Sequence, residues 1–488
     1  MIEIDDKRIE GVAKDIYHTA VGILAKHGVL VDEPFCRSRI MDSGKATCKD
    51  NRIYYAKDVI ESMVPFGEAS DFRFDYLEKT AFTRKAFREA EDKDKIAGFA
   101  FGVYDVEQKQ VRDALAADLE EALKLCDVMG IGGHYPCAAM DVPPAIRNVF
   151  AHKMCLTRSR YNSTHVCLGK EQAQYIHPMY EALGEDAAMP ISLTSVTPLR
   201  IETSNLEVIR YFLEKNVDKQ SVHIFPIAYG LPGVNYPITL AGAWSLCFAE
   251  HLALYITAKL LDTGFEVAGS WGLTNFPAVD YANVCIADGS SLQHLHNTFN
   301  NILAHAVLGR DYREYEPAEI GLYTGSPSPD VQAGAEKMAA ALYGLQRNRN
   351  VHFGWLGNLC LDDVFSMEQM LLDLEIIAYA RNSVAAFDNY ELHLDFESCQ
   401  DDIEAFIKNG TDFLAADSTI KYLREVYHPL KHFEYKKLAT YKDQSHDQLI
   451  KRVSERKREL LASYDYRVDE DVEKEINGIY KRAQDSLR

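Results

Sequence analysis

The stretch from Val222 to Trp271 most constrains how this chain can fold. It begins with a short apolar run, long enough for one buried strand, and continues through a turn rich in Gly, Pro and Asn. A long, almost uncharged helix is then predicted from Pro237 to about Leu261, because proline suits a first helical turn and Gly264 supplies a left-handed cap. A second apolar run ends at Trp271. A strand–helix–strand unit of this kind is typical of a parallel sheet with its helix packed on one face.

Similar units recur along the chain from residue 130 onward. Seven apolar or β-branched runs are predicted as strands, at 131–140, 161–167, 191–196, 222–225, 265–268, 320–323 and 351–355. An eighth strand is weakly marked and is placed within 384–394, and helical segments separate the runs. This alternation favours a (β/α)8 barrel or a doubly wound open sheet. No Gly-x-Gly-x-x-Gly turn follows the first strand, which argues against a dinucleotide-binding sheet.

The two flanks have a different pattern from the centre. We expect an N-terminal cap over 1–95, with helices within 8–35 and near 56–63 and a polar, turn-rich stretch between them. The strand–helix rhythm occupies 96–400. Residues 401–488 have no clear strand signal, are rich in Lys and Glu toward their end, and are expected to form a helical extension.

Composition excludes several classes of protein. The formal net charge of −20 argues against nucleic-acid or anionic-membrane partners, which need concentrated Lys and Arg. No apolar run approaches the length of a membrane helix, and the acidic start lacks a signal-peptide profile. The 10 cysteines are scattered without a Cys-x-x-Cys, so we expect reduced thiols and a cytoplasmic protein.

Several segments, taken in order, resemble the trimethylamine methyltransferase superfamily. They lie at 16–32, 141–147, 197–199, 237–243, 249–250, 329–337 and 413–424. The resemblance is to the branch without pyrrolysine, which acts on quaternary amines such as glycine betaine, proline betaine or carnitine. It implies a TIM (β/α)8 barrel, and methyl transfer to Co(I) of a corrinoid held on a separate small protein. It also implies a homo-oligomer. The loops at 280–284, 289–292 and 325–328 differ from the usual sequence of the family, so the identity of the amine stays open.

A quaternary ammonium carries a permanent charge, so its neutral amine can leave without protonation. Aromatic faces bind such a cation through their quadrupole, with about 0.5–2 kcal/mol for each contact. The predicted strand ends and adjoining loops offer a set of aromatic residues: Tyr104, Phe225, Tyr229, Tyr236, Trp271, Phe276, Tyr323 and Trp355. Any single one can equally be a core or rim residue. We predict a cage that includes Tyr104, Phe225, Tyr229, Trp271, Tyr323 and Trp355.

Polar candidates are fewer. His352 and His165 are possible partners for a substrate carboxylate, although a lone His is more often structural. Glu250 stands in an otherwise almost uncharged helix and is the catalytic candidate, because it can offset the ammonium charge; pairing with an arginine is the structural alternative. Asp141 and Asp330 are expected to cap helices. The cysteines and histidines never adopt zinc spacing, and no cofactor-binding motif is present, so no metal and no tightly held cofactor are expected.

The leading hypothesis is a corrinoid-dependent methyltransferase for a quaternary amine. One alternative is a TIM-barrel methyltransferase or lyase that acts on a different methyl donor. Another is a non-catalytic protein that binds a betaine. Methyl transfer from a panel of amines distinguishes the first two, and tight binding without turnover would select the third.

Overall fold

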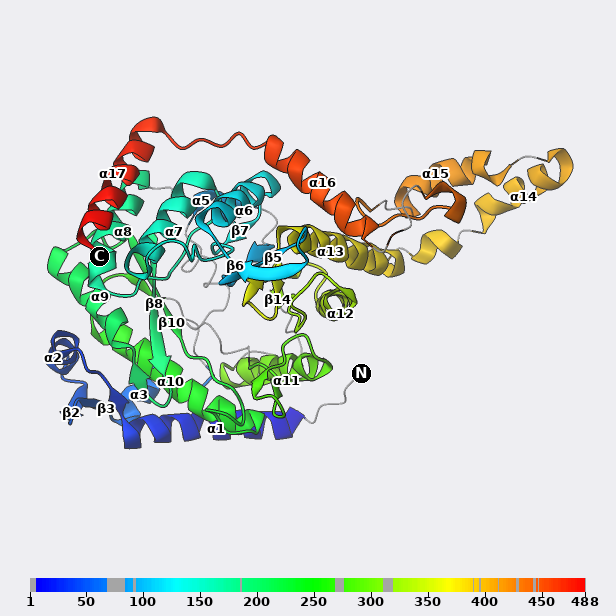
Figure 1. The fold of residues 1–488 in the computed structure, drawn as a ribbon. Coiled ribbons are helices and arrows are strands. Elements are labelled where there is room, and N and C mark those ends of the chain that lie inside the picture. Colours follow the sequence, from blue (N-terminus) through cyan, green and yellow to red (C-terminus); the bar gives the residue numbers. More distant parts are fainter. Residues whose placement is uncertain are drawn as a thin grey trace.

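The computed structural model describes residues 6–67, 84–90, 94–184, 187–267, 276–309, 319–388, 390–394, 396–410, 412–426, 430–441, 445 and 447–487. An N-terminal helical part is followed by a central body of alternating strands and helices (Figure 1). The C-terminal helices run out from this body and then return to it.

The N-terminal part contains α1 (Asp6–His27), β1 (Val29–Leu30), α2 (Pro34–Asp42), β2 (Ala46–Lys49), β3 (Arg52–Tyr55) and α3 (Lys57–Met63). The first half of the body contains α5 (Lys85–Glu89), β4 (Lys95–Ile96), β5 (Gly102–Asp105), β6 (Gln110–Asp113), α6 (Ala116–Met129), β7 (Gly132–Gly133), α7 (Pro144–Arg158), α8 (Lys170–Leu183), β8 (Met189–Val196), β9 (Arg200–Ile201), α9 (Thr203–Lys215) and β10 (Val222–Ile227). The second half contains α10 (Leu240–Leu260), β11 (Glu266–Val267), β12 (Val279–Asp280), β13 (Cys285–Ile286), α11 (Ser291–Val307), β14 (Glu319–Gly321), α12 (Val331–Arg347), β15 (His352–Gly354), β16 (Asn358–Leu359), β17 (Val364–Phe365) and α13 (Met367–Asp388). The C-terminal part contains η3 (Tyr390–Leu394), α14 (Glu397–Asn409), η4 (Phe413–Ala415), α15 (Asp417–Val426), η5 (Leu438–Thr440), α16 (Gln448–Ala462) and α17 (Glu470–Ser486).

One arc of parallel strands is formed by β8, β10 and β11. β10 pairs with β8 from Val222↔Met189 to Ile227↔Thr194, and β11 continues the sheet in the same direction. The predicted strand–helix–strand unit is therefore confirmed, with α10 as its crossover helix. The helix begins later than predicted, since the Thr239 side chain caps it by accepting from the Gly242 amide, and Pro237 precedes it.

A second arc is formed by β14, β15, β4 and β7. β14 pairs with β15 in parallel, β4 pairs with β7 in parallel, and Gly133 forms a parallel bridge to Asn162. β15 lies beside β4, where the Leu356 amide donates to the Lys95 carbonyl at 3.4 Å. The prediction of an α/β fold built on parallel strands is thus confirmed. Across the described residues the parallel strands form two arcs rather than one continuous closed sheet.

Several strand assignments differ from the sequence-based prediction. The run at 161–167, predicted as a strand, forms only an isolated bridge at Asn162. The strand at Lys95–Ile96 was missed, because two residues in a charged stretch give no apolar run. The prediction of a strand within 384–394 was wrong, because this stretch forms the end of α13 and the short helix η3. Its alanines favour the helix that precedes it.

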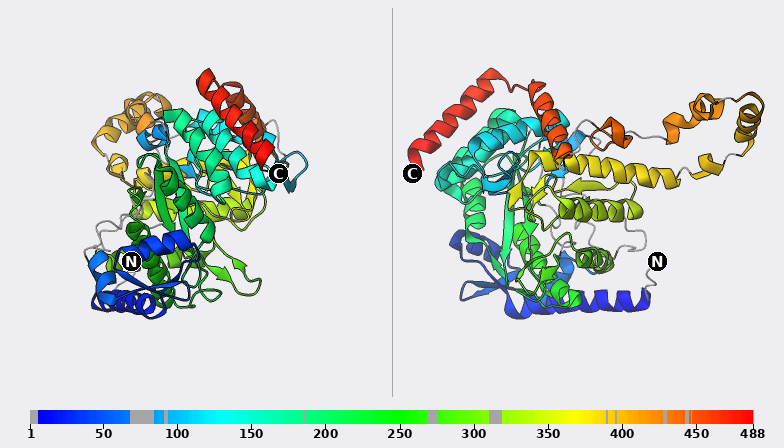
Figure 2. Two further views of the ribbon diagram at one scale, coloured as in Figure 1. Left: turned by 90° about the vertical axis from the view of Figure 1, so that its left-hand side faces the viewer. Right: turned by 45° about the vertical axis from the view of Figure 1, so that its right-hand side comes forward.

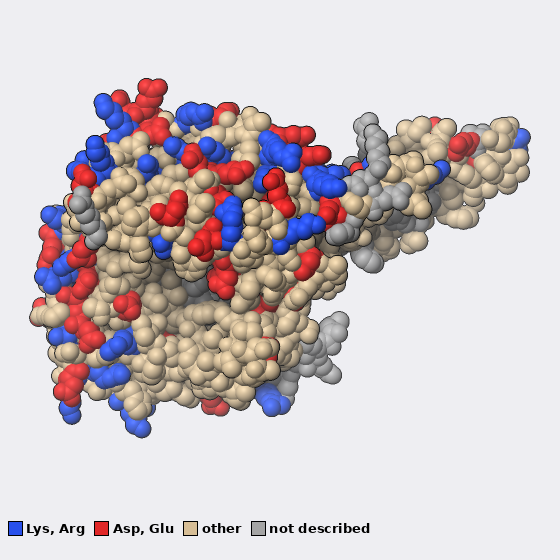
Figure 3. All heavy atoms as spheres, viewed as in Figure 1, with Lys and Arg blue, Asp and Glu red and all other residues tan. Residues whose placement is uncertain are grey.

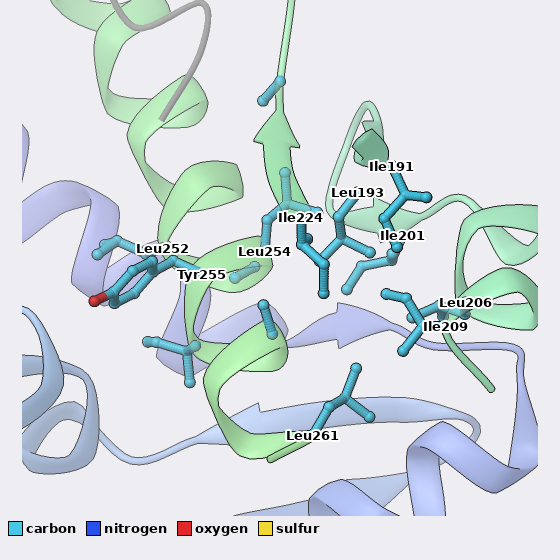
Figure 4. Packing of buried hydrophobic residues seen from close by; sticks show 14 of the residues in the cluster. Ile191, Leu193, Ile201, Leu206, Ile209, Ile224, Leu252, Leu254, Tyr255 and Leu261 are labelled. Atoms are coloured by element: carbon cyan, nitrogen blue, oxygen red, sulfur yellow. The ribbon is translucent and has the colours of Figure 1, made fainter. Parts of the chain in front are cut away.

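The buried apolar side chains form two large cores. The first gathers α1, the β8–β10 arc, α10, α11 and α17, and Figure 4 shows its side chains from β8 and β10 packed beside those of α10. The second gathers α6, α12, α13, α16 and the β14–β15–β4 strands, and α7 contributes residues to both. α10 is buried nearly all round, which explains its almost uncharged sequence. Each large aliphatic side chain buried in this way stabilises the fold by about 1.5–3 kcal/mol.

The N-terminal part is joined to the first arc. The polar stretch after α1 forms α2 and the β2–β3 hairpin, which the sequence did not predict, and the β1 residue Leu30 pairs in parallel with Arg200 of β9. α1 packs along α10. The division at residues 95 and 400 remains a prediction.

The C-terminal helices α14 and α15 form an arm that projects from the body (Figures 1 and 2). The arm exposes large apolar side chains, among them Ile407 at 76% and Leu414 at 80%. The chain then returns, so that α16 packs on α6 and α13, and α17 packs on α7 and α8. In the part of the chain that the structure describes, no helix combines the length and apolar character needed to cross a bilayer.

Candidate functional site

Two aromatic rings meet at the ends of neighbouring strands. Tyr323 follows β14 and Trp355 follows β15, and because these strands run in parallel, their carboxyl ends lie at the same edge. The ring centroids are 4.7 Å apart and the planes are inclined by 42°. The Tyr323 ring folds back over Gly321, where a Cβ would collide with it. Glycine at that position therefore gives the ring its place beside Trp355.

The loop after β15 holds a strained backbone. Trp355, Cys360 and Leu361 have φ values of +59°, +47° and +66°, in the left-handed region that bulky side chains avoid. The Cys360 amide donates to the Ser326 carbonyl at 2.7 Å, and the Leu361 amide donates to the Thr324 carbonyl at 2.8 Å. These bonds tie the loop to the segment that follows β14 and hold it in its unusual conformation.

A buried ion pair supports the same loop through a hydrogen bond to its backbone. Lys337 Nζ lies 2.7 Å from Asp373 Oδ2, and both side chains are fully buried. The Gly357 amide also donates to Asp373 at 2.7 Å, and so does the Gln369 side chain. Burial raises the pKa of Asp373 and lowers that of Lys337, while their mutual attraction opposes both shifts. The pair therefore fixes the backbone two residues after Trp355.

A carboxylate stands beside the indole in this loop. A Cβ placed on Gly98 would lie 3.1 Å from Trp355 Nε1 and 3.3 Å from Asp362 Oδ2, so the two side chains converge on one point. Asp362 has an exposed surface, yet protein encloses it on most sides, and this burial together with Asp363 raises the pKa of its carboxyl. Asp362 therefore reaches solvent while its carboxyl is partly shielded by the surrounding protein.

A second carboxylate, Asp288, reaches the same region from the loop before α11. Its residue is only 4% exposed, and no described group hydrogen-bonds to Oδ1. Burial, reinforced by the charge of Asp362, raises the pKa of Asp288 to about 7, although a backbone hydrogen bond at Ala278 opposes the shift. The next residue, Gly289, has a φ of +89°, and its Cβ position lies 2.9 Å from the Tyr323 carbonyl oxygen.

Tyr229 completes the group at the carboxyl end of β10. Burial raises the pKa of its hydroxyl well above 10, and the charges of Asp288 and Asp362 add to the shift, so the phenol stays neutral. Tyr229 and Asp288 come from elements of the first core, whereas the other three residues come from elements of the second. Figure 3 shows a hollow in the surface between these two halves. The Tyr323 and Trp355 rings are thus in contact, Asp362 lies beside Trp355, and the charge of Asp362 acts on Tyr229 and Asp288. Aromatic rings with carboxyls near them are suited to binding a cation.

Glu250 is held by groups of the chain itself. Its carboxylate accepts from the Tyr236 hydroxyl at 2.5 Å, from the Leu199 amide at 2.9 Å and from the Thr197 hydroxyl at 3.1 Å. Burial raises the pKa of Glu250, although the donated hydrogen bonds oppose the shift. The Tyr236 ring in turn covers Gly230, the residue after Tyr229. These contacts favour a role in positioning the β10 loop, and a catalytic role for Glu250 remains a prediction.

Comparisons with known proteins bear on the whole chain. The family model described as trimethylamine methyltransferase (MTTB) matches residues 8–487. The chain belongs to the trimethylamine methyltransferase family. It is also 24% identical over 426 residues to the trimethylamine methyltransferase MttB1 of Methanosarcina mazei, covering 83% of this chain and 80% of that protein. Membership makes the chain a methyltransferase of methylated amines, and the predicted resemblance to the superfamily is confirmed.

The structure of this trimethylamine methyltransferase family member places two of the predicted aromatic residues, Tyr323 and Trp355, in contact. Tyr229 lies near enough to Asp288 and Asp362 for their charges to act on its hydroxyl. Tyr104 lies elsewhere, on the β5–β6 hairpin, where it packs against Leu359 and Val364 on the hairpin that carries Asp362. Phe225 lies in β10, but its side chain is outside the described set, and Trp271 lies outside the described residues altogether.

The predicted histidines do not supply a positive charge to this site. His352 is the first residue of β15, about 10 Å along the strand from Trp355 at a rise near 3.3 Å per residue. His165 lies with its ring centroid 4.9 Å from that of His134. Burial lowers the pKa of His165 to about 4 and that of His134 well below its usual value, so both rings are neutral at neutral pH.

The two helix-cap predictions had different outcomes. Asp330 caps α12 by accepting from the Ala333 amide, as predicted. Asp141 caps a different helix from the one expected, since it accepts from the Ala116 amide at the start of α6. The α7 helix that follows Asp141 has Pro143 at its N-cap position instead.

Sequence reasoning missed the carboxylates Asp288 and Asp362. Asp362 follows the predicted strand 351–355 by 7 positions and Asp288 follows 265–268 by 20, and an acidic residue in such a loop is unremarkable on its own. The available signal was the Asp288-Gly289-Ser290 run directly before a helix, and the Asp362-Asp363 pair soon after a strand-end tryptophan. Within the described residues, no three His, Cys, Asp or Glu side chains gather closely enough to hold a metal ion.

Proposed function

We propose that this chain removes a methyl group from a quaternary amine and passes it to the Co(I) corrinoid of a separate protein. The observation that carries the proposal is the contact of Tyr323 with Trp355 at the ends of parallel strands, with the carboxyl of Asp362 beside the indole. Aromatic faces and nearby negative charge stabilise a permanent cation, whereas a neutral methyl donor gains little from them. Family membership supplies the methyl-transfer chemistry.

The residues of the site have two tasks in such a reaction. Tyr323 and Trp355 hold the methylated nitrogen by cation–π contact, and Asp288 and Asp362 offset its charge. The bound amine is thereby oriented with one methyl group available for in-line attack. The carbon–nitrogen bond breaks, its electron pair stays on nitrogen, and a neutral tertiary amine leaves without needing a proton. A reduced corrinoid supplies the nucleophile that takes the methyl group.

The site fits an external acceptor better than a resident one. Asp362 and Asp363 are exposed, so this side of the site is open to an approaching carrier protein. The sequence offers no Asp-x-His-x-x-Gly segment of the kind that resembles a cobalamin-binding signature. A separate corrinoid protein is therefore the proposed partner.

We further propose that the two arcs belong to one TIM barrel. Taken in chain order, β4, β7, the segment at Asn162, β8, β10, β11, β14 and β15 give eight parallel positions, and β15 lies beside β4 as closure requires. The site residues then stand at the carboxyl end of the strands, where barrel enzymes bind substrate. The apolar arm of α14 and α15 supports a homo-oligomer, and we place the enzyme in the cytoplasm.

Methyl transfer to free Co(I) cobalamin tests the function. The protein is mixed with Co(I) cobalamin and one of tetramethylammonium, choline, glycine betaine, carnitine or trimethylamine, and loss of the Co(I) absorbance is followed. We expect methylation with at least one quaternary amine. Trp355→Leu should reduce the rate, whereas the matched control Tyr379→Leu, which changes a partly exposed aromatic residue on α13, should not. Transfer from trimethylamine alone, or from none of the amines, would refute the proposal.

A further inference from the structure

The charge of the site points to one class of amine. Asp288 is 4% exposed, and its Oδ1 has no described hydrogen-bond partner. A buried carboxylate oxygen without a partner is costly unless the group stays protonated or a cation arrives. The next residue, Gly289, lies against the backbone of Tyr323, which places Asp288 beside the aromatic pair. A cationic ligand bound there would supply the missing partner.

No described cation already balances these two acids. Neither Asp288 nor Asp362 forms an ion pair with a described Lys, Arg or His, and the charged groups that influence their carboxyls are themselves acidic. By contrast, Asp373 on α13 is matched by Lys337, and Asp127 on α6 is matched by Arg160. Asp373 and Asp127 thus have a cationic partner among the described residues, whereas Asp288 and Asp362 have none.

A betaine substrate would bring its own carboxylate close to Asp288 and Asp362. Its carboxylate is held only a few bonds from the nitrogen, so it cannot leave the neighbourhood of the cage once the ammonium is bound. Carboxylates are recognised by Arg, Lys or several donated hydrogen bonds. Of the two predicted candidates, His165 is neutral, as is its neighbour His134, and His352 lies at the other end of its strand.

We propose, building on the function proposed above, that the substrate is a quaternary ammonium without a carboxylate, such as choline or tetramethylammonium. Asp288 and Asp362 are then the residues that determine this specificity. They attract the ammonium group and repel the carboxylate of a zwitterion, while Tyr229, Tyr323 and Trp355 accept either ligand's methyl groups.

Binding calorimetry tests the class of amine independently of turnover. Choline, tetramethylammonium, glycine betaine and the uncharged choline analogue 3,3-dimethylbutan-1-ol are titrated into the full-length protein. We expect choline to bind at least tenfold more tightly than glycine betaine and than the uncharged analogue. Equal or tighter binding of glycine betaine would overturn the proposal.

Variants connect the preference with the two acids. Asp362→Asn and Asp288→Asn should each reduce the ratio of betaine to choline dissociation constants by at least threefold. Asp113→Asn, which removes an exposed carboxylate on β6, should leave the ratio unchanged. A ratio that is unaffected by either site substitution would also overturn the proposal.

The two proposals fail in distinguishable ways. Tight binding of choline that depends on the two acids, without methyl transfer to cobalamin, would refute the methyltransferase function and leave the ligand class standing. Rapid demethylation of glycine betaine, with choline bound weakly, would refute the ligand class and support the function.

Discussion

Replacing Asp288 by Asn should make the ligand-free protein more stable at neutral pH. An aspartate in an unfolded chain has a pKa of about 3.9. Burial in the folded protein raises the pKa of Asp288 to about 7. Between these two values the folded state holds a proton that the unfolded state has lost, so the free energy of unfolding falls as the pH rises. Above pH 7 both states are ionised and the loss is complete.

The size of the effect follows from that window. Each pH unit within it corresponds to about 1.4 kcal/mol, so the wild-type protein should lose about 2–3 kcal/mol through this group between pH 5 and pH 7. Asp288→Asn has no proton to release and should not show this loss. The stability of the variant relative to the wild type should therefore increase over the window and level off above it.

Urea unfolding at pH 5, 6, 7 and 8, without ligand, measures the difference. Asp113→Asn serves as the control for removing one negative charge from the surface. Parallel pH dependences of the wild type and Asp288→Asn would refute the reasoning, because the carboxyl would then titrate alike in both states. Asp288→Asn should also weaken choline binding. The Asp288 carboxyl would then lower the stability of the ligand-free protein while it contributes to ligand affinity.

Three further outcomes are expected. Trp355→Ala should raise the dissociation constant for choline about 2- to 30-fold, equivalent to a contact of about 0.5–2 kcal/mol; calorimetry that shows no change would remove the ring from the cage. Glu250→Ala should lower the free energy of unfolding by about 1–3 kcal/mol, because the Tyr236 hydroxyl, the Thr197 hydroxyl and the Leu199 amide would lose their acceptor. A stably folded Glu250→Gln that has lost all turnover would instead assign this residue to catalysis. Lys337→Met should cost about 3–5 kcal/mol by leaving Asp373 uncompensated, and adding Asp373→Leu should restore much of it; urea unfolding without that recovery contradicts the pair's role.

Sequence reasoning succeeded where a pattern was long. The unit around α10 was predictable because an almost uncharged helix between two apolar runs has few other ways to be buried. Tyr323 and Trp355 were predictable because aromatic residues directly followed strand signals. The two-residue strand β4 was not predicted, since a strand that short has no period to detect, and β7 occupies only two residues of the longer run predicted at 131–140.

The polar parts of the site were harder to predict. Glu250 attracted notice by its apolar surroundings, but its partners are a tyrosine, a threonine and a backbone amide rather than an arginine. Those partners are brought to it by the turn after β8 and by the β10 loop, which no local pattern predicts. Asp288 and Asp362 lie 74 positions apart in the numbering, and only the packing of two halves brings them together.

The division of the site between two apolar cores affects how the protein melts. The two cores share α7 but otherwise gather mostly different elements, so heating the ligand-free protein should produce a broad or two-step transition. A cation that contacts Tyr229 and Asp288 on one side and Trp355 on the other stabilises only the state in which both cores are intact. Saturating choline should therefore merge the two unfolding steps into one sharper transition. Backbone amide exchange should then slow in both apolar cores together.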